Sequence, residues 1–167
     1  MEPVLRPLCR SDAPAAAALI RAVFAAQPVV LDPPPSALGV TADTLAAHLS
    51  RAGGAVAESN DRIVGVVLWE PADGALQVSR LAVDPEARRR GTARALLAAA
   101  EQAARQHGFA RLRLGTRLAL AGNRQLFAGC GFVEVAWHAH PGYAEPTWVE
   151  MEKQLAQQAR QARLPAF

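Results

Sequence analysis

The sequence is poor in several residue types, and each scarcity narrows the class of protein. Its two cysteines, Cys9 and Cys130, lie far apart and share no metal-ligand spacing, so neither a disulfide framework nor a metal site is expected. Such sparse use of cysteine is typical of a reduced, cytoplasmic protein. No uncharged apolar run is long enough to span a bilayer, and the opening residues lack the apolar segment of a secretory signal. We therefore expect neither a membrane span nor a leader.

Lysine is almost absent as well, because Lys153 is the only one and arginine supplies the rest of the positive charge. Arginine binds phosphate through paired hydrogen bonds, but a general compositional bias explains the preference more simply. The net charge of +3 is a mild excess that suits an anionic ligand or an ordinary surface. With 167 residues, 51% of them hydrophobic and 20% charged, the chain has the size and composition of one globular domain.

Hydrophobic periodicity and turn residues predict strands and helices over most of the chain. A strand, a helix and a strand follow one another over residues 76–116, which implies a parallel βαβ unit. The sequence is polar from Gln154 onward, so we assign residues 1–153 to one domain and residues 154–167 to a polar tail. The expected helices cover 13–26, 41–51, about 92 to 108 and 123–129, and the expected strands cover 4–9, 55–58, 63–69, 76–83, 111–116, 132–138 and 148–153.

One of these strands has a defect in its alternation. Leu76 and Val78 share one face by the period of two, whereas Leu81 and Val83 share a face of the opposite parity. One extra residue near Ser79-Arg80, a β-bulge, would return all four side chains to a common face. A strand buried on both faces would also tolerate the lost alternation, so the pattern leaves both explanations open.

An arginine-rich turn with one glycine, Arg88 to Ala93, follows this strand and opens the next helix. The first N–H groups of a helix are unpaired and carry partial positive charge, so they attract phosphate. Gly91 would let the backbone approach a ligand closely. Three consecutive arginines are unfavourable at a helix start, and a bound anion would remove the conflict. The alternative is a solvated basic turn; the sequence contains neither the P-loop nor the dinucleotide-binding glycine pattern.

The segment from Leu81 to Leu97 resembles motif A of the GNAT superfamily of acyl-CoA-dependent N-acetyltransferases. That motif places Gln or Arg first, Gly at the fourth position and Gly or Ala at the sixth, and Arg88, Gly91 and Ala93 fill it here. The order of predicted elements is similar to the family from Val4 to Lys153. The resemblance implies an α/β (α+β) fold: a strongly twisted mixed sheet of six to seven strands, about four flanking helices and a β-bulge in the fourth strand.

The resemblance also implies acetyl-CoA as cofactor, CoA as product, and no metal. The backbone at the end of the bulged strand would pair with the pantetheine arm, and the N–H groups of the turn would cradle the pyrophosphate. The implied cofactor site comprises Leu81, Ala82, Val83, Arg88, Arg89, Arg90, Gly91, Thr92, Ala93, Arg94, Asn123 and Phe127.

Two positions depart from the family pattern. Many members place a tyrosine before the Gly-Phe pair as general acid to the departing thiolate, and Phe127, which occupies that position, cannot donate a proton. Some members carry a glutamate on the bulged strand as general base, and the matching residue is Gln77. The resemblance implies acetyl transfer to a primary amine by direct attack in a ternary complex. The departures keep open an acyl-CoA-binding sensor or interaction module without turnover.

Three other residues are candidates for the acid and base chemistry. Tyr143, the only tyrosine, and His140 lie in the loop before the last strand, and Glu70 ends an earlier strand. Each also has a structural explanation: Tyr143 would pack the hairpin, His140 would be an ordinary loop residue, and Glu70 would be a surface carboxylate.

The resemblance places the acceptor pocket between residues 24–38, the second helix and residues 138–146. Asp32 would hold a cationic amine or cap its own loop, and Trp69 and Trp137 would line the pocket or pack in the core. Nucleic-acid binding by the arginine cluster lacks interleaved aromatic residues and a strong net charge. The expected partners are a small-molecule or peptide amine acceptor, no nucleic acid and no membrane, with the chain a monomer or homodimer.

Overall fold

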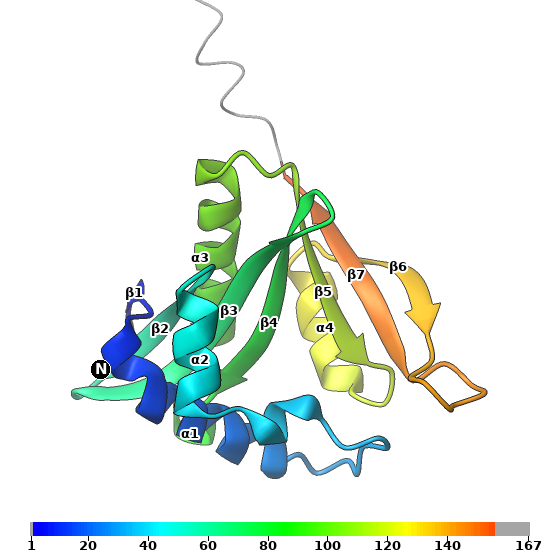
Figure 1. Cartoon of the computed structure of the whole chain (residues 1–167), viewed down its shortest axis with the longest axis horizontal. Helices are drawn as coiled ribbons and strands as arrows, with labels where there is room; N and C mark the ends of the chain where they lie inside the picture. The colour runs from blue at the N-terminus through cyan, green and yellow to red at the C-terminus, as the bar shows by residue number, and fades with distance from the viewer. Residues whose placement is uncertain (1, 156–167) are drawn as a thin grey trace, which may run out of the picture.

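Seven strands form one mixed sheet in the order β1-β2-β3-β4-β5-β7-β6 (Figure 1). The computed structural model describes residues 2–155. Only β4 and β5 run parallel, which is the pairing expected of the predicted βαβ unit. The strands are β1 (Val4–Pro7), β2 (Gly53–Ser59), β3 (Arg62–Ala72), β4 (Ala75–Val83), β5 (Arg111–Arg117), β6 (Val133–His138) and β7 (Trp148–Gln154). The helices are α1 (Ala13–Ala25), α2 (Ala42–Leu49), α3 (Thr92–Gln106) and α4 (Ala121–Gly129), with 3-10 turns η1 (Arg10–Asp12), η2 (Ser36–Gly39) and η3 (Pro85–Ala87).

Two hydrophobic layers enclose the sheet, one on each face. Ile20 of α1 and Leu45 of α2 pack on one face against Val56, Val66 and Ala82. The other layer gathers α3, the end of α4 and the apolar side chains of β4, β5 and β7. A side chain of this size gains roughly 1.5–3 kcal/mol on full burial, so these two layers contribute much of the stability of the fold.

The entrance to α1 is fixed by a partly buried ion pair. Asp12 is 8% exposed, and Arg6 donates to its carboxylate at 2.8 and 2.9 Å. The backbone N–H of Cys9 donates to the same carboxylate at 2.8 Å. These hydrogen bonds lower the pKa of Asp12, with Arg6 the largest cause, although burial opposes the shift.

A β-bulge interrupts β4, as the defect in its alternation suggested. Leu68 of β3 lies opposite Ser79 and Val66 lies opposite Ala82, so Arg80 and Leu81 face a single residue of β3. Arg80 adopts a left-handed backbone conformation, with φ of 54°. The bulge brings Leu81 and Val83 to the same hydrophobic layer as the start of the strand. The second explanation also holds in part, because Ala82 is buried in the opposite layer.

The sheet opens between β4 and β5. The two strands pair only at Leu76 with Leu112 and at Gln77 with Arg113. Beyond these pairs they diverge, and Figure 1 shows them meeting at one end and separating toward the other. The remainder of β4 therefore has a free edge inside the sheet.

The folded part extends two residues past the expected boundary at 153. β7 runs to Gln154, and Leu155 is buried against the layer of α3. Residues 156–167 of the expected tail lie outside the described residues. The single lysine, Lys153, donates to Glu101 of α3 at 3.0 Å. Over residues 2–155, no helix has both the length and the hydropathy needed to cross a bilayer.

Candidate active site

The turn between β4 and α3 is shaped by two residues with left-handed backbones. Gly91 has φ of 76° and Arg89 has φ of 63°. The conformation is ordinary for glycine and costs a residue with a side chain about 1–2 kcal/mol. The Thr92 hydroxyl donates to the Ala87 carbonyl at 3.2 Å, and the Arg88 side chain donates to the Val83 carbonyl at 3.2 Å. These bonds hold the turn against the end of β4.

Six consecutive backbone N–H groups in this turn, from Arg89 to Arg94, have no hydrogen-bond acceptor among residues 2–155. The helix ladder begins one residue later, where Ala95 donates to the Gly91 carbonyl at 2.9 Å. Unpaired N–H groups at the start of a 15-residue helix form a ready site for an anion. The turn therefore has the geometry of an anion site, and its role as a phosphate turn stays a prediction.

A cavity of about 440 Å³ lies over this turn. Most of the predicted cofactor residues line it: Leu81, Val83, Arg88, Arg89, Gly91, Thr92, Ala93, Arg94 and Asn123. The N-terminal segment closes the other side through Val23, Phe24 and Pro28. The Arg94 guanidinium already uses one of its N–H groups, because it donates to the Gly129 carbonyl at 3.4 Å.

Two predicted cofactor residues do not present their side chains to this cavity. Arg90 lines a separate shallow hollow beside Glu86 and Asn60, because the left-handed residues on both sides of it turn it away. Ala82 is buried in the layer of α1 and α2. Only the backbone of these two residues is therefore available to a ligand at this turn.

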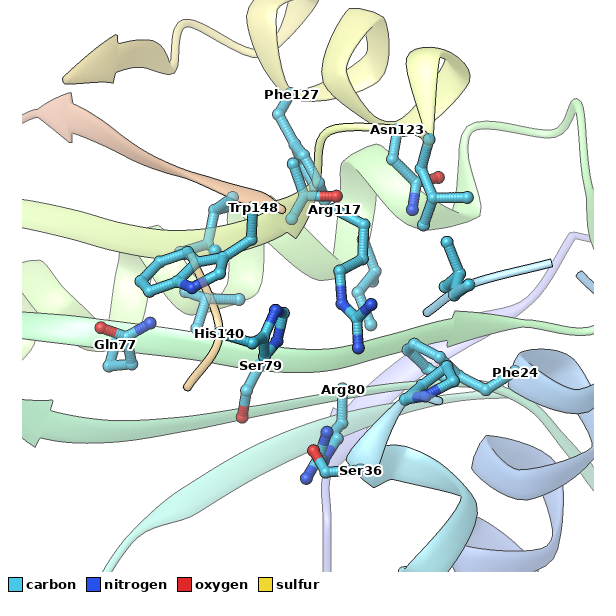
Figure 2. Close-up of a pocket in the computed structure, with 18 residues that line it drawn as sticks. Phe24, Ser36, Gln77, Ser79, Arg80, Arg117, Asn123, Phe127, His140 and Trp148 are labelled. Atoms are coloured by element: carbon cyan, nitrogen blue, oxygen red, sulfur yellow. The ribbon is translucent and has the colours of Figure 1, made fainter. Parts of the chain in front are cut away.

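A second cavity, of about 310 Å³, occupies the gap between the diverging strands. Phe24, Leu81 and Asn123 line both cavities, so the two adjoin. In Figure 2, side chains from β4 converge with side chains from β5, α4 and the β6–β7 loop. The lining residues are Phe24, Leu31, Pro35, Ser36, Gln77, Val78, Ser79, Arg80, Leu81, Leu114, Gly115, Thr116, Arg117, Leu120, Asn123, Phe127, His140 and Trp148.

Phe127 and Gln77, the two positions that depart from the family pattern, both line this second cavity. Phe127 is buried and packs edge-on against Phe132. It was predicted as a cofactor residue, and it lies at the strand gap rather than beside the phosphate turn. Neither side chain can take or give a proton usefully, so acid or base chemistry must come from another residue of the cavity.

His140 is the one candidate catalytic residue that lines the cavity. Its ring Nδ1 is in hydrogen-bond contact with the Thr147 hydroxyl, and the Thr147 oxygen also accepts from the His140 N–H at 3.0 Å. Burial lowers the pKa of His140, and the positive charge of Arg117 lowers it further. Both effects disfavour the protonated, charged form of the imidazole.

Tyr143 lies outside the cavity lining, in the loop that carries His140. Its hydroxyl donates to the carboxylate of Asp32, in the proline-rich segment after α1. This hydrogen bond is the main cause of a raised pKa of Tyr143. Asp32 thus contacts a tyrosine across the two loops, which neither of the explanations given for it from the sequence anticipated.

Glu70 and the two tryptophans named from the sequence line neither cavity. Glu70 pairs with Arg51 at 3.4 Å, so it lies with the end of α2. Trp137 is 58% exposed and hydrogen-bonds to Glu134, while Trp69 packs against Gly53. Glu70 therefore fits the alternative of a surface carboxylate, and a catalytic role for it stays a prediction.

Sequence reasoning missed Arg80, Arg117 and Trp148, which all line the cavity. Gly115 could have indicated a bulky neighbour such as Trp148, because a glycine inside a strand often marks a place where another group packs closely against the backbone. A Cβ at Gly115 would lie 3.1 Å from the Trp148 ring. Within residues 2–155, no cluster of His, Cys, Asp and Glu side chains could hold a metal ion.

Comparison with known proteins identifies the family. The model of the acetyltransferase (GNAT) family matches residues 20–132. No curated protein sequence matches the chain. Solved structures do: the ribosomal-protein-S18-alanine N-acetyltransferase of Escherichia coli superposes with a TM-score of 0.73 at 20% identity, covering 92% of this chain and 94% of that one.

Two further structures were solved with a cofactor. The PaiA N-acetyltransferase of Thermoplasma acidophilum, in complex with coenzyme A, gives a TM-score of 0.75 at 16% identity, covering 93% of this chain and all of that one (100%). YncA of Salmonella typhimurium, with acetyl-CoA, gives 0.70 at 20% identity, covering 95% and 97%. At such identities the likeness shows the shared fold. Together with the family match, it shows that this chain belongs to the GNAT family of acetyltransferases.

Proposed function

We propose that the chain transfers an acetyl group from acetyl-CoA to a primary amine, carried by a small molecule or a peptide, by direct attack in a ternary complex. The proposal rests on one observation: the two cavities meet at Leu81, which lines both of them. A cradle for an anion lies on one side of this residue, and a cavity containing a neutral histidine lies on the other. The free edge of β4 runs between them.

The residues present fit acetyl-CoA. The unpaired N–H groups of Arg89 to Arg94 suit a pyrophosphate, and Arg88 and Arg89 add positive charge at the same cavity. The edge of β4 at Leu81 and Val83 suits pantetheine, an extended chain with two amides that can pair with a strand. Bound there, acetyl-CoA supplies a thioester whose carbonyl is open to attack. The CoA-bound neighbours from Thermoplasma acidophilum and Salmonella typhimurium support this cofactor.

His140 is proposed as the base that receives the amine proton, directly or through one water. A lysine-like amine has a pKa of about 10.4 and must lose a proton before it attacks. The lowered pKa of His140 suits that role, and Arg117 disfavours its protonated form. A backbone N–H on the open part of β4 would polarise the thioester carbonyl.

The leaving group needs little help from the protein. A thiol has a pKa of about 8.5, so the thiolate departs without a dedicated proton donor. This accounts for a phenylalanine at position 127. Tyr143 keeps its proton because of its raised pKa, but it stands outside the cavity lining. We therefore assign it to positioning the loop that carries His140.

The same two positions, Phe127 and Gln77, favour a second candidate, an acyl-CoA-binding module without turnover. Release of free thiol from acetyl-CoA in the presence of a panel of primary amines distinguishes the two, with calorimetry measuring CoA affinity in parallel. We expect amine-dependent thiol release, and a fall of about 100-fold or more in kcat for His140→Gln. Tight CoA binding with no thiol release would instead identify a sensor.

A further inference from the structure

The second cavity contains a guanidinium with no partner. Arg80 lies on the bulge of β4, is half-buried, and has no hydrogen bond or ion pair with any of residues 2–155. Burial alone lowers its pKa. A cation removed from water without a counter-ion is unfavourable, so this position is stabilised when an anion enters the cavity.

A second arginine faces the same space from β5. Arg117 is partly buried, and within residues 2–155 its guanidinium donates only to the Pro34 carbonyl, at 3.4 Å. Burial is the main cause of its lowered pKa. Tyr143 and Asp32 offset this in part, but the Asp32 carboxylate already accepts from Tyr143, and neither residue lines the cavity. Both arginines line the cavity, and Figure 2 shows Arg117 pointing toward β4 while Arg80 extends from β4 beside Ser36.

The rest of the lining offers no compensating negative charge. It contains no aspartate or glutamate, and His140 is its only other ionisable side chain. Arg80 and Arg117 also line only this cavity, whereas the phosphate turn has Arg88, Arg89 and its own N–H groups. The two cations thus face the acceptor side, where they repel polycationic amines and attract an acceptor with an anionic group.

The walls define the remainder of the acceptor. Leu31, Leu120, Phe127 and Trp148 make much of the lining apolar, and the cavity of about 310 Å³ suits a small molecule. A molecule with an amine, a carboxylate and an apolar side chain would contact His140, the two arginines and these walls together.

We propose that Arg80 and Arg117 form an anion subsite, and that the acceptor is a free α-amino acid with an apolar side chain rather than the amino terminus of a peptide. The inference rests on the proposed acetyl transfer to an amine. A peptide amino terminus carries a neutral amide where a free amino acid carries its carboxylate. The charge of that group therefore distinguishes the two acceptors.

Binding tests the subsite without turnover. The probes are N-acetyl-L-phenylalanine and its neutral amide, N-acetyl-L-phenylalaninamide, titrated by calorimetry into the chain saturated with CoA and into the chain alone. We expect the acid to bind about 10- to 100-fold more tightly than the amide, as loss of a charge-assisted hydrogen bond predicts. Equal affinity for acid and amide would overturn the proposal.

Variants assign the preference to the two arginines. Arg80→Gln and Arg117→Gln should each reduce the acid-to-amide ratio about tenfold or more while leaving CoA affinity unchanged. Arg10→Gln is the matched control, because Arg10 is exposed and lines neither cavity. Loss of CoA affinity in Arg80→Gln, or an unchanged ratio in both variants, would overturn the subsite.

Thiol release with L-phenylalanine and L-phenylalaninamide then separates the two proposals. The amide has the less basic and more readily deprotonated amine, so faster turnover of the acid cannot arise from amine reactivity. We expect kcat/KM to favour the acid by at least about tenfold. Faster turnover of the amide overturns the subsite and keeps the acetyltransferase. No thiol release with either acceptor or with any other amine of the panel overturns the proposed function, and the binding ratio still decides the subsite.

Discussion

The hydroxyl of Tyr143 donates a hydrogen bond to the carboxylate of Asp32, across 111 positions of sequence. Tyr143 belongs to the β6–β7 loop, and Asp32 belongs to the proline-rich segment between α1 and η2. Residues near both of them line the second cavity, where the acceptor is proposed to bind. These residues are His140 on one loop and Leu31 and Pro35 on the other. The contact therefore fixes the distance between two walls of that cavity.

Tyr143→Phe removes this donor, and we expect the KM of the amine acceptor to rise about two- to tenfold while the KM of acetyl-CoA is unchanged. The melting temperature should hardly change, because the pair lies at the surface. Asp32→Asn is the matched control, since its amide oxygen still accepts from the phenol and the effect should be smaller. A fall in kcat with an unchanged acceptor KM would show instead that Tyr143 acts on the reacting atoms.

Gly91→Val tests the phosphate turn. Valine is unfavourable at φ of 76°, so the turn would rotate its N–H groups away from a common point, and the CoA dissociation constant should rise at least about tenfold. The stability cost should stay near 1–2 kcal/mol, because a Cβ at Gly91 meets no atom within 4 Å. Gly39→Val is the control, since Gly39 has equally free space and an ordinary backbone. Both quantities can be read from calorimetry and urea unfolding.

His140 should titrate below the usual histidine pKa of about 6.5. Its charged form is disfavoured, so the ring becomes protonated only at a lower pH than an ordinary histidine. Proton NMR of the histidine rings measures this midpoint directly, and His140→Gln assigns the resonance. Removal of the positive charge in Arg117→Gln should raise the midpoint toward the ordinary value. A midpoint at or above 6.5 in the unaltered chain would contradict the lowered pKa.

Asp12→Asn should lower the free energy of unfolding by about 1.5–3 kcal/mol at neutral pH, because it breaks charge-assisted hydrogen bonds at a buried position. The pKa of Asp12 is lowered in the folded chain, so the unfolded chain takes up the proton first as pH falls. The contribution is complete above the unfolded pKa of about 3.9 and is lost as pH falls through the folded value. Urea unfolding at pH 7 and pH 3 should show a smaller pH difference for the variant. Asp43→Asn, at an exposed position of α2, should behave like the unaltered chain.

Local patterns predicted most of the fold. The period of Leu96, Leu97 and Ala100 identified α3, and the parity change in β4 suggested a bulge near Ser79-Arg80 as one of two explanations. Both signals are short in range, because a helix face or a strand face is set by neighbours along the chain. The phosphate turn was also local, since Gly91 and the start of α3 lie within a few residues.

The acceptor side was less predictable because it depends on contacts between distant segments. Whether Arg117 and Trp148 face a cavity is decided by the divergence of β4 from β5, which leaves no periodic signal. The sequence does not distinguish Glu70 from other carboxylates at strand ends. Its ion pair with Arg51 depends on the tertiary fold. Arg90 looked equivalent to its two neighbours, and the left-handed turn at Arg89 separates them.

The divergence of β4 and β5 also makes the chain a sheet in two parts. β1 to β4 form one part and β5, β7 and β6 form the other, and between them the ladder has only two residue pairs. α3 packs against strands of both parts and so connects them. A pantetheine arm lying along the free edge of β4 would extend the ladder and stiffen this junction. A bound cofactor would then connect the two parts of the sheet. Amide hydrogen exchange would slow first at the edge of β4 that faces β5.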